Sequence, residues 1–187
     1  MPNVYDANVE VHTRMADSYN SNEPHFRPEN QDKVRARLLD VRNRVAGGKL
    51  LDIGCGTGFI IHLAAPIFDE IHGVDITPAM MAKVRLDAGN ITLHQAFAED
   101  LPFGDNSFDA VSAYSFIDHV QSPAKVLAEV SRVLKPGGVL YIDLAPNRLF
   151  WEAVSGVEAS NDEKFSAIVS REISMVKEND KKVEQEY

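Results

Sequence analysis

The sequence predicts an α/β fold in which one doubly wound parallel sheet carries helices on both faces. Short apolar segments alternate with segments whose apolar residues recur at helical spacing, which is the pattern of successive βαβ units. The first apolar segment, residues 49–53, runs directly into a glycine-rich turn and then a helix. The chain has 187 residues, of which 44% are hydrophobic and 25% charged, so it can close one sizeable core. We therefore expect a single domain over residues 1–187.

The chain begins with a polar lead-in over residues 1–28, which is expected to contain a short helix near residues 9–19. A longer helix is expected over residues 29–45, with Gly47 and Gly48 ending it. The apolar positions that recur at helical spacing in this second helix are Val34, Leu38, Leu39, Val41 and Val45.

The core of the domain is expected over residues 29–144. Its strands are expected over residues 49–53, 71–75, 91–96, 108–114 and 139–144. Its further helices are expected over residues 59–65, 77–88 and 123–134. Thr77 and Pro78 suit the start of the second of these helices, and the turn at residues 135–138 suits the end of the third. Residues 145–187 return to helical spacing and predict a helical C-terminal segment.

Composition excludes several classes of function. The 28 acidic residues outnumber the 19 basic ones for a net charge of −9, which argues against a domain that grips nucleic-acid phosphates. Cys55 is the single cysteine, so no internal disulfide is expected and nothing suggests a metal site. The sequence shows neither a signal peptide nor an apolar run long enough to cross a bilayer, and we expect a cytoplasmic protein without a membrane partner.

The strongest functional signal is the turn Gly54-Cys55-Gly56-Thr57-Gly58 after the first strand. Alternate glycines permit unusual backbone angles and let a ligand approach the main chain. Strand ends of a parallel sheet are where such a ligand binds. The nicotinamide fingerprint G-x-G-x-x-G would require glycine where Phe59 stands, and no Gly-Lys-Ser/Thr follows for a P-loop. The spacing therefore argues against both phosphate-binding motifs.

Four motifs in order resemble those of the class I S-adenosylmethionine-dependent methyltransferases, in particular the small-molecule enzymes of the methyltransferase-domain-11 type. They are Asp52–Gly58, Gly73–Ile76, Ala98–Phe103 with Asn106–Asp109, and Leu134–Gly138. The match extends over residues 49–143. The resemblance implies a Rossmann-like methyltransferase sandwich with parallel strand order 3-2-1-4-5. It also implies S-adenosylmethionine as cofactor and S-adenosylhomocysteine as product.

The resemblance assigns cofactor contacts residue by residue. The loop of Gly54, Cys55, Gly56 and Gly58 would face the methionine part of the cofactor, with Tyr114 near the same end. On the adenosine side, the contacts would be Asp75 to the ribose hydroxyls, Ile76 against the adenine face, and Ala98 and Glu99 at the adenine edge.

The sequence departs from the family at two places. Many relatives carry an aspartate where this chain has Phe97, so we expect apolar packing and backbone contacts to hold the adenine. The family also adds a C-terminal antiparallel hairpin, whereas the residues after Asp143 read as helices. Either the chain is shortened or its sheet edge is closed otherwise, for instance by a second copy in a homo-oligomer.

The expected reaction is transfer of the sulfonium methyl group to an O, N or C nucleophile of a small-molecule acceptor. Alignment of the reacting atoms can supply much of the acceleration. His119 is the candidate general base, with a histidine bonded to nearby backbone as the alternative reading, and Asp118 is similarly ambiguous. The N-terminal segment could cover the site with aromatic residues, namely His12, Tyr19, His25 and Phe26.

Two other functions stay open. A cofactor-binding subunit or regulator could keep this fold without transferase activity, as the atypical C-terminal part favours. A nicotinamide-dependent oxidoreductase is disfavoured by Phe59.

Overall fold

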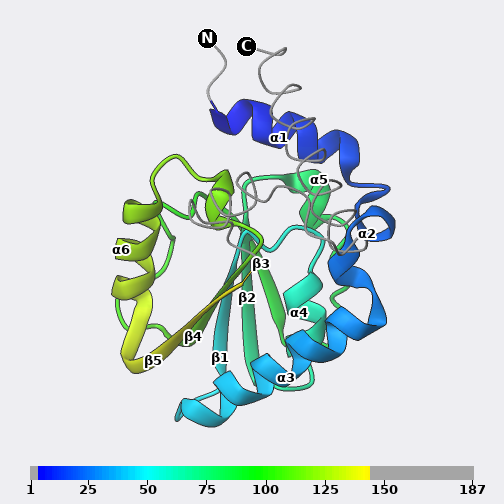
Figure 1. Ribbon diagram of the computed structural model, residues 1–187. Coiled ribbons are helices and arrows are strands. Elements are labelled where there is room, and N and C mark those ends of the chain that lie inside the picture. The colour runs from blue at the N-terminus through cyan, green and yellow to red at the C-terminus, as the bar shows by residue number, and fades with distance from the viewer. Residues whose placement is uncertain (1–3, 144–187) are drawn as a thin grey trace, which may run out of the picture. The chain divides into compact units, whose positions relative to one another are not determined.

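A computed structural model describes residues 4–143 (Figure 1). Its sheet has five parallel strands in the order β3-β2-β1-β4-β5, which confirms the predicted fold class and strand order. The strands are β1 (Lys49–Ile53), β2 (Glu70–Asp75), β3 (Ile91–Gln95), β4 (Phe108–Tyr114) and β5 (Leu134–Asp143). The α-helices are α1 (Val4–Met15), α2 (Tyr19–Asn22), α3 (Pro28–Arg44), α4 (Phe59–Ala64), α5 (Pro78–Met81) and α6 (Pro123–Val133). Two 3-10 turns are η1 (Pro24–Phe26) and η2 (Ile117–His119).

Helices cover both faces of the sheet. Residues 8–143 belong to one compact unit, in which α3 and α4 lie on one face of the sheet and α6 on the other (Figure 1). Neighbouring residues of β1 show why: Leu50 packs with the α3 and α4 side chains, and Leu51 packs with those of α6. Because successive strand residues point to opposite faces, an apolar run without alternation fills both cores.

The strand order reverses at the centre of the sheet. β1 pairs with β2 on one side and with β4 on the other, and all of these pairings are parallel. The carboxyl ends of β1, β2 and β4 therefore meet at one edge, at the point where the strand order reverses. Ligands of open α/β sheets bind at this topological switch point.

The predicted helix over residues 77–88 is wrong in length, because α5 ends at Met81. The N–H groups of Lys83 and Val84 bond to carbonyls three residues back instead of four. The next one, that of Arg85, donates to Nε2 of His62 at 3.0 Å. A contact with α4 therefore takes the donor that would have continued the helix.

The first helices also differ from expectation. The helix expected near residues 9–19 is α1, which spans Val4–Met15, and α2 and η1 follow before α3. α3 ends at Arg44, where Val45 turns to extended backbone, so Gly47 and Gly48 do not cap it. A Cβ atom at Gly47 would lie 2.4 Å from a carboxylate oxygen of Asp109, and this close approach explains the glycine there.

β5 begins earlier than predicted, at Leu134 directly after α6. Leu134 pairs with Phe108, and the next pair is Ala110 with Val139, so the predicted turn at residues 135–138 is an irregularity inside the strand. The predicted C-terminal helices, the missing hairpin and the end of the last strand at Leu144 lie outside the described residues. Within residues 4–143, no helix combines the length and the apolar character that a membrane crossing requires.

Candidate functional site

The glycine loop leaves β1 with three residues of positive φ. Gly54, Gly56 and Gly58 have φ angles of +67°, +50° and +87°, which L side chains rarely adopt. The N–H of Cys55 donates to the carbonyl of Val74 at 3.0 Å, so the loop folds against the end of β2. The glycine spacing that marked the motif is therefore a backbone requirement.

Asp75, at the end of β2, holds the loop in place. Its Oδ2 accepts the N–H of Gly56 at 2.8 Å, and its Oδ1 accepts the N–H of Thr77 at 2.7 Å. Thr77 begins α5 as predicted, but its side chain makes no capping bond. A carboxylate offers about four lone-pair sites, so two acceptor positions remain on Asp75.

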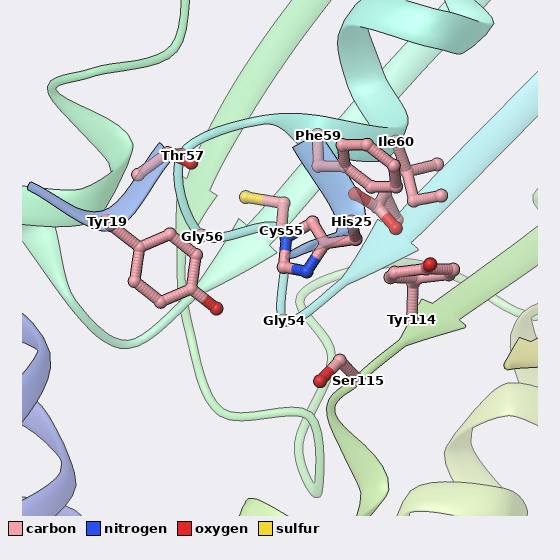
Figure 2. A pocket seen from close by; sticks show the side chains of 11 residues that line it. Tyr19, His25, Gly54, Cys55, Gly56, Thr57, Phe59, Ile60, Tyr114 and Ser115 are labelled. Atoms are coloured by element: carbon pink, nitrogen blue, oxygen red, sulfur yellow. The ribbon is translucent and has the colours of Figure 1, made fainter. Parts of the chain in front are cut away.

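A cavity opens between this loop, the end of β4 and the N-terminal segment (Figure 2). Its lining residues are Tyr19, His25, Asp52, Gly54, Cys55, Gly56, Thr57, Phe59, Ile60, Tyr114 and Ser115. The lining includes one carboxyl group, four aromatic rings and neither lysine nor arginine. Such a surface suits a cationic or neutral ligand with flat parts better than a phosphate-bearing one.

Asp52 is the acidic group of the cavity. It is buried on β1, and the hydroxyl of Ser112 donates to its Oδ1 at 2.7 Å. Burial, and to a smaller extent the nearby charge of Asp75, raises the pKa of this carboxyl to about 7. A cationic ligand in the cavity would favour the ionised form of Asp52.

The N-terminal segment closes one side of the cavity with rings. We call the five side chains of Tyr19, His25, Phe26, Phe59 and Tyr114 the aromatic wall. The His25 ring centroid lies 4.6 Å from that of Phe59, 5.6 Å from that of Tyr114 and 6.1 Å from that of Tyr19. Phe26 packs on Phe59 at 5.0 Å. Three of the expected lid residues thus belong to this wall.

Polar contacts fasten the same segment to the cofactor-binding motifs. The hydroxyl of Thr57, in the glycine loop, donates to Oδ1 of Asn20 at 2.5 Å. Nζ of Lys83, just after α5, contacts Oδ1 of Asp17 at 2.5 Å. The segment therefore lies against both the loop and the residues that follow β2.

His25 is the most enclosed polar residue that the N-terminal segment brings to the cavity. It is 6% exposed, and burial lowers the pKa of its imidazole to about 4, so the ring is neutral near pH 7. The nearest ionic group is Oε2 of Glu23, 3.7 Å from its Nδ1. The sequence indicates His25 only as part of a lid, because nothing in the residues around it predicts the cavity.

The residues predicted at the adenine lie beyond β2 and β3 and do not line this cavity. Ile76 and Glu99 are half-buried, and Ala98 is buried. The amide of Gln95 donates to the carbonyl of Ile76 at 3.4 Å, which brings the ends of β2 and β3 together. Phe97 is 46% exposed beside them. Their assignment to the adenine stays a prediction.

His119, the candidate base, lies in η2 after β4. It is exposed and outside the cavity lining, and its ring stands edge-on to that of His12 at 5.5 Å between centroids. Burial lowers the pKa of His12. The structure therefore brings two histidines together outside the cavity lining, and a catalytic role for His119 stays a prediction.

Residues 51–142 match the family described as methyltransferase domain. Over this range, just under half of the 187 residues, the chain is similar to that family. The matched range includes β1, the glycine loop, Asp75 and nearly all of β5.

Curated relatives of the domain carry methyltransferase names. A ubiquinone biosynthesis O-methyltransferase from Pseudomonas aeruginosa is 32% identical over 152 residues, which cover 76% of this chain and 64% of the relative. A demethylmenaquinone methyltransferase from Chlorobaculum parvum is 41% identical over 95 residues, covering 50% of this chain and 39% of the relative. The chain thus spans less than two thirds of the length of these relatives.

Solved structures share the fold of the domain. The YcgJ protein from Bacillus subtilis aligns with a TM-score of 0.57 at 29% identity, covering 66% of this chain and 56% of that one. The [4+2]-cyclase SpnF aligns with a TM-score of 0.64 at 23% identity, covering 75% and 60%. The second likeness concerns the fold alone, because one fold can carry unrelated chemistries.

Proposed function

We propose that the chain binds S-adenosylmethionine along the ends of β1, β2 and β4, with one end of the cofactor in the cavity beside β1 and β4, and transfers its methyl group to a small-molecule acceptor. The observation that carries the proposal is the glycine loop held by Asp75 at the sheet's switch point. Beside it lies a cavity whose lining has neither lysine nor arginine. This lining suits a sulfonium ligand, which is cationic and carries no phosphate. The methyltransferase names of the relatives support the same reading.

The residues of the site fit the parts of this cofactor. Asp75 keeps acceptor positions for the two ribose hydroxyls while it holds Gly56 and Thr77. The buried carboxyl of Asp52 lies where the cationic end would enter, and Tyr114 and Phe59 offer ring faces to a sulfonium. Ile76, Ala98 and Glu99 would flank the adenine.

The acceptor in this proposal is an aromatic ring that bears a hydroxyl group. Two relatives are named for quinone chemistry, and the first is named as an O-methyltransferase. The aromatic wall offers ring faces on which a flat acceptor can stack. The lining has no lysine or arginine to favour an anionic acceptor.

The chain's contribution to such a reaction is mainly positional. Bound S-adenosylmethionine supplies an electrophilic methyl group. The glycine loop and the aromatic wall would hold the reacting atoms in line and exclude water. The acceptor hydroxyl must lose its proton, and His119 with its neighbour His12 is the candidate pair to take it.

A turnover assay tests the proposal. The full chain would be incubated with methyl-labelled S-adenosylmethionine and catechol-type acceptors, and both labelled product and S-adenosylhomocysteine would be measured. We expect equal amounts of the two, with turnover reduced at least tenfold in His119→Ala if that residue is the base. Nearly full turnover in His119→Ala would remove the residue from catalysis and leave the reaction itself supported.

Two results would redirect the proposal. Cofactor binding without turnover on any acceptor would favour the non-catalytic subunit or regulator. Binding of reduced nicotinamide cofactor, detected by its fluorescence, together with no binding of S-adenosylmethionine, would favour an oxidoreductase and overturn the proposal.

A further inference from the structure

His25 has an unusual position for a polar side chain. It is 6% exposed and lines the cavity, yet within residues 4–143 its ring nitrogens make no hydrogen bond. The Glu23 oxygen at 3.7 Å is too distant to count as one. The side chain is buried as a whole but its ring borders the cavity, so its unpaired nitrogens are available to a ligand bound there.

The surroundings of His25 restrict what that ligand part can be. The ring is held by Phe59 at 4.6 Å and Phe26 at 4.7 Å between centroids, so it cannot turn freely toward solvent. The polar groups that line the cavity with it are those of the glycine loop, Asp52, Ser115 and the hydroxyls of Tyr19 and Tyr114. The loop and Tyr114 are the groups expected at the methionine end of the cofactor.

Proton abstraction is a poor role for this imidazole. Burial lowers its pKa to about 4, whereas a phenolic hydroxyl has a pKa of about 10. A cationic sulfonium nearby would disfavour the imidazolium further. A neutral imidazole can nevertheless donate one hydrogen bond to a carboxylate or accept one from an ammonium.

We propose that His25 hydrogen bonds to the amino-acid end of the cofactor, opposite Asp52. The inference rests on the proposed function, because it assigns one contact within the same site. The contact belongs to the N-terminal segment, which also meets the glycine loop through Thr57 and Asn20. The segment therefore binds the cofactor directly and is more than a cover.

Two ligands that differ only at this end test the inference. S-adenosylhomocysteine carries the amino-acid end, and 5′-methylthioadenosine lacks it while keeping adenosine and the thioether. Calorimetric titration would measure both affinities in the full-length parent, in His25→Phe and in His94→Phe. His25→Phe keeps a ring against Phe59 and removes the two nitrogens, and His94→Phe makes the same change on β3, outside the cavity lining.

We expect His25→Phe to weaken S-adenosylhomocysteine about tenfold or more and methylthioadenosine less than about twofold. His94→Phe should change neither affinity by more than about twofold. His25→Gln, which restores a donor and an acceptor, should recover part of the loss. The ratio of the two affinities is internal to each protein, so a partly unfolded variant still gives a valid comparison.

Equal weakening of both ligands by His25→Phe, or no weakening of S-adenosylhomocysteine, would overturn the inference and leave the proposed function standing. Failure of the folded parent to bind either ligand would instead overturn the proposed function, and this inference with it.

Discussion

Alanine substitutions at Gly54 and Gly56 separate two costs of building the glycine loop. Both residues have positive φ, +67° and +50°, and an alanine there costs about 1–2 kcal/mol in backbone strain. A Cβ at Gly54 would also lie 2.0 Å from Cδ2 of Phe116, whereas a Cβ at Gly56 finds only Cε of Met80 at 3.5 Å. Overpacking adds about 1–3 kcal/mol, so Gly54→Ala should lose about 2–5 kcal/mol and Gly56→Ala about 1–2 kcal/mol.

Urea unfolding of the full chain, followed by circular dichroism, measures both losses. Gly56→Ala is the matched control because it shares the strained backbone without the close contact. The double variant Gly54→Ala with Phe116→Ala should recover the overpacking part of the loss. Equal losses for Gly54→Ala and Gly56→Ala, or no recovery in the double variant, would refute the reasoning from the Phe116 contact.

Two further predictions concern charge. The pKa of Asp52 is raised from 3.8 to about 7 in the folded state, so its contribution to stability is present below pH 3.8 and lost as the pH rises through 7. Asp52→Asn should therefore have a free energy of unfolding about 2–4 kcal/mol higher than the parent at pH 8 and no higher at pH 3.5. Urea unfolding at both pH values measures this, and a stability gain independent of pH would contradict it. Arg132 binds both Glu129 oxygens at 2.8 and 2.7 Å and the Phe103 carbonyl at 2.7 Å, so Arg132→Lys should lose about 1–3 kcal/mol. The control Arg35→Lys, at an exposed ion pair, should lose under about 0.5 kcal/mol, and similar losses at both sites would count against the assigned role of Arg132.

Periodicity predicted the elements whose form is decided locally. β1 and β4 are apolar runs between turn signals, and the structure has them at residues 49–53 and 108–114 as expected. The predicted length of α5 is too great, because the hydrogen bond from the Arg85 N–H to His62 depends on the packing of α4. No local sequence pattern predicts that packing. The strand predicted for β5 is too short for a similar reason. Lys-Pro-Gly-Gly at residues 135–138 is typical of a turn, although the chain pairs with β4 on both sides of these residues.

The candidate site was predictable where a motif lies beside its strand. The glycine loop and Asp75 were found in this way, and their mutual hydrogen bond at 2.8 Å follows from the adjacency of β1 and β2. The sequence identifies Asp52 only as part of the glycine-loop motif. Its burial depends on β4, whose Ser112 lies beside it in the fold. Tyr19 and His25 reach the cavity from α2 and η1, which have four and three residues and are too short to carry a periodic signal.

Calorimetric titration of the full chain with S-adenosylhomocysteine most directly tests where the cofactor binds, comparing the parent with Asp75→Ala and with the surface control Asp87→Ala. We expect one binding site, an affinity at least tenfold weaker in Asp75→Ala, equivalent to about 1.4 kcal/mol, and no change in Asp87→Ala. Unchanged affinity in a folded Asp75→Ala, or no binding by the parent, would contradict the placement of the cofactor at the ends of β1 and β2.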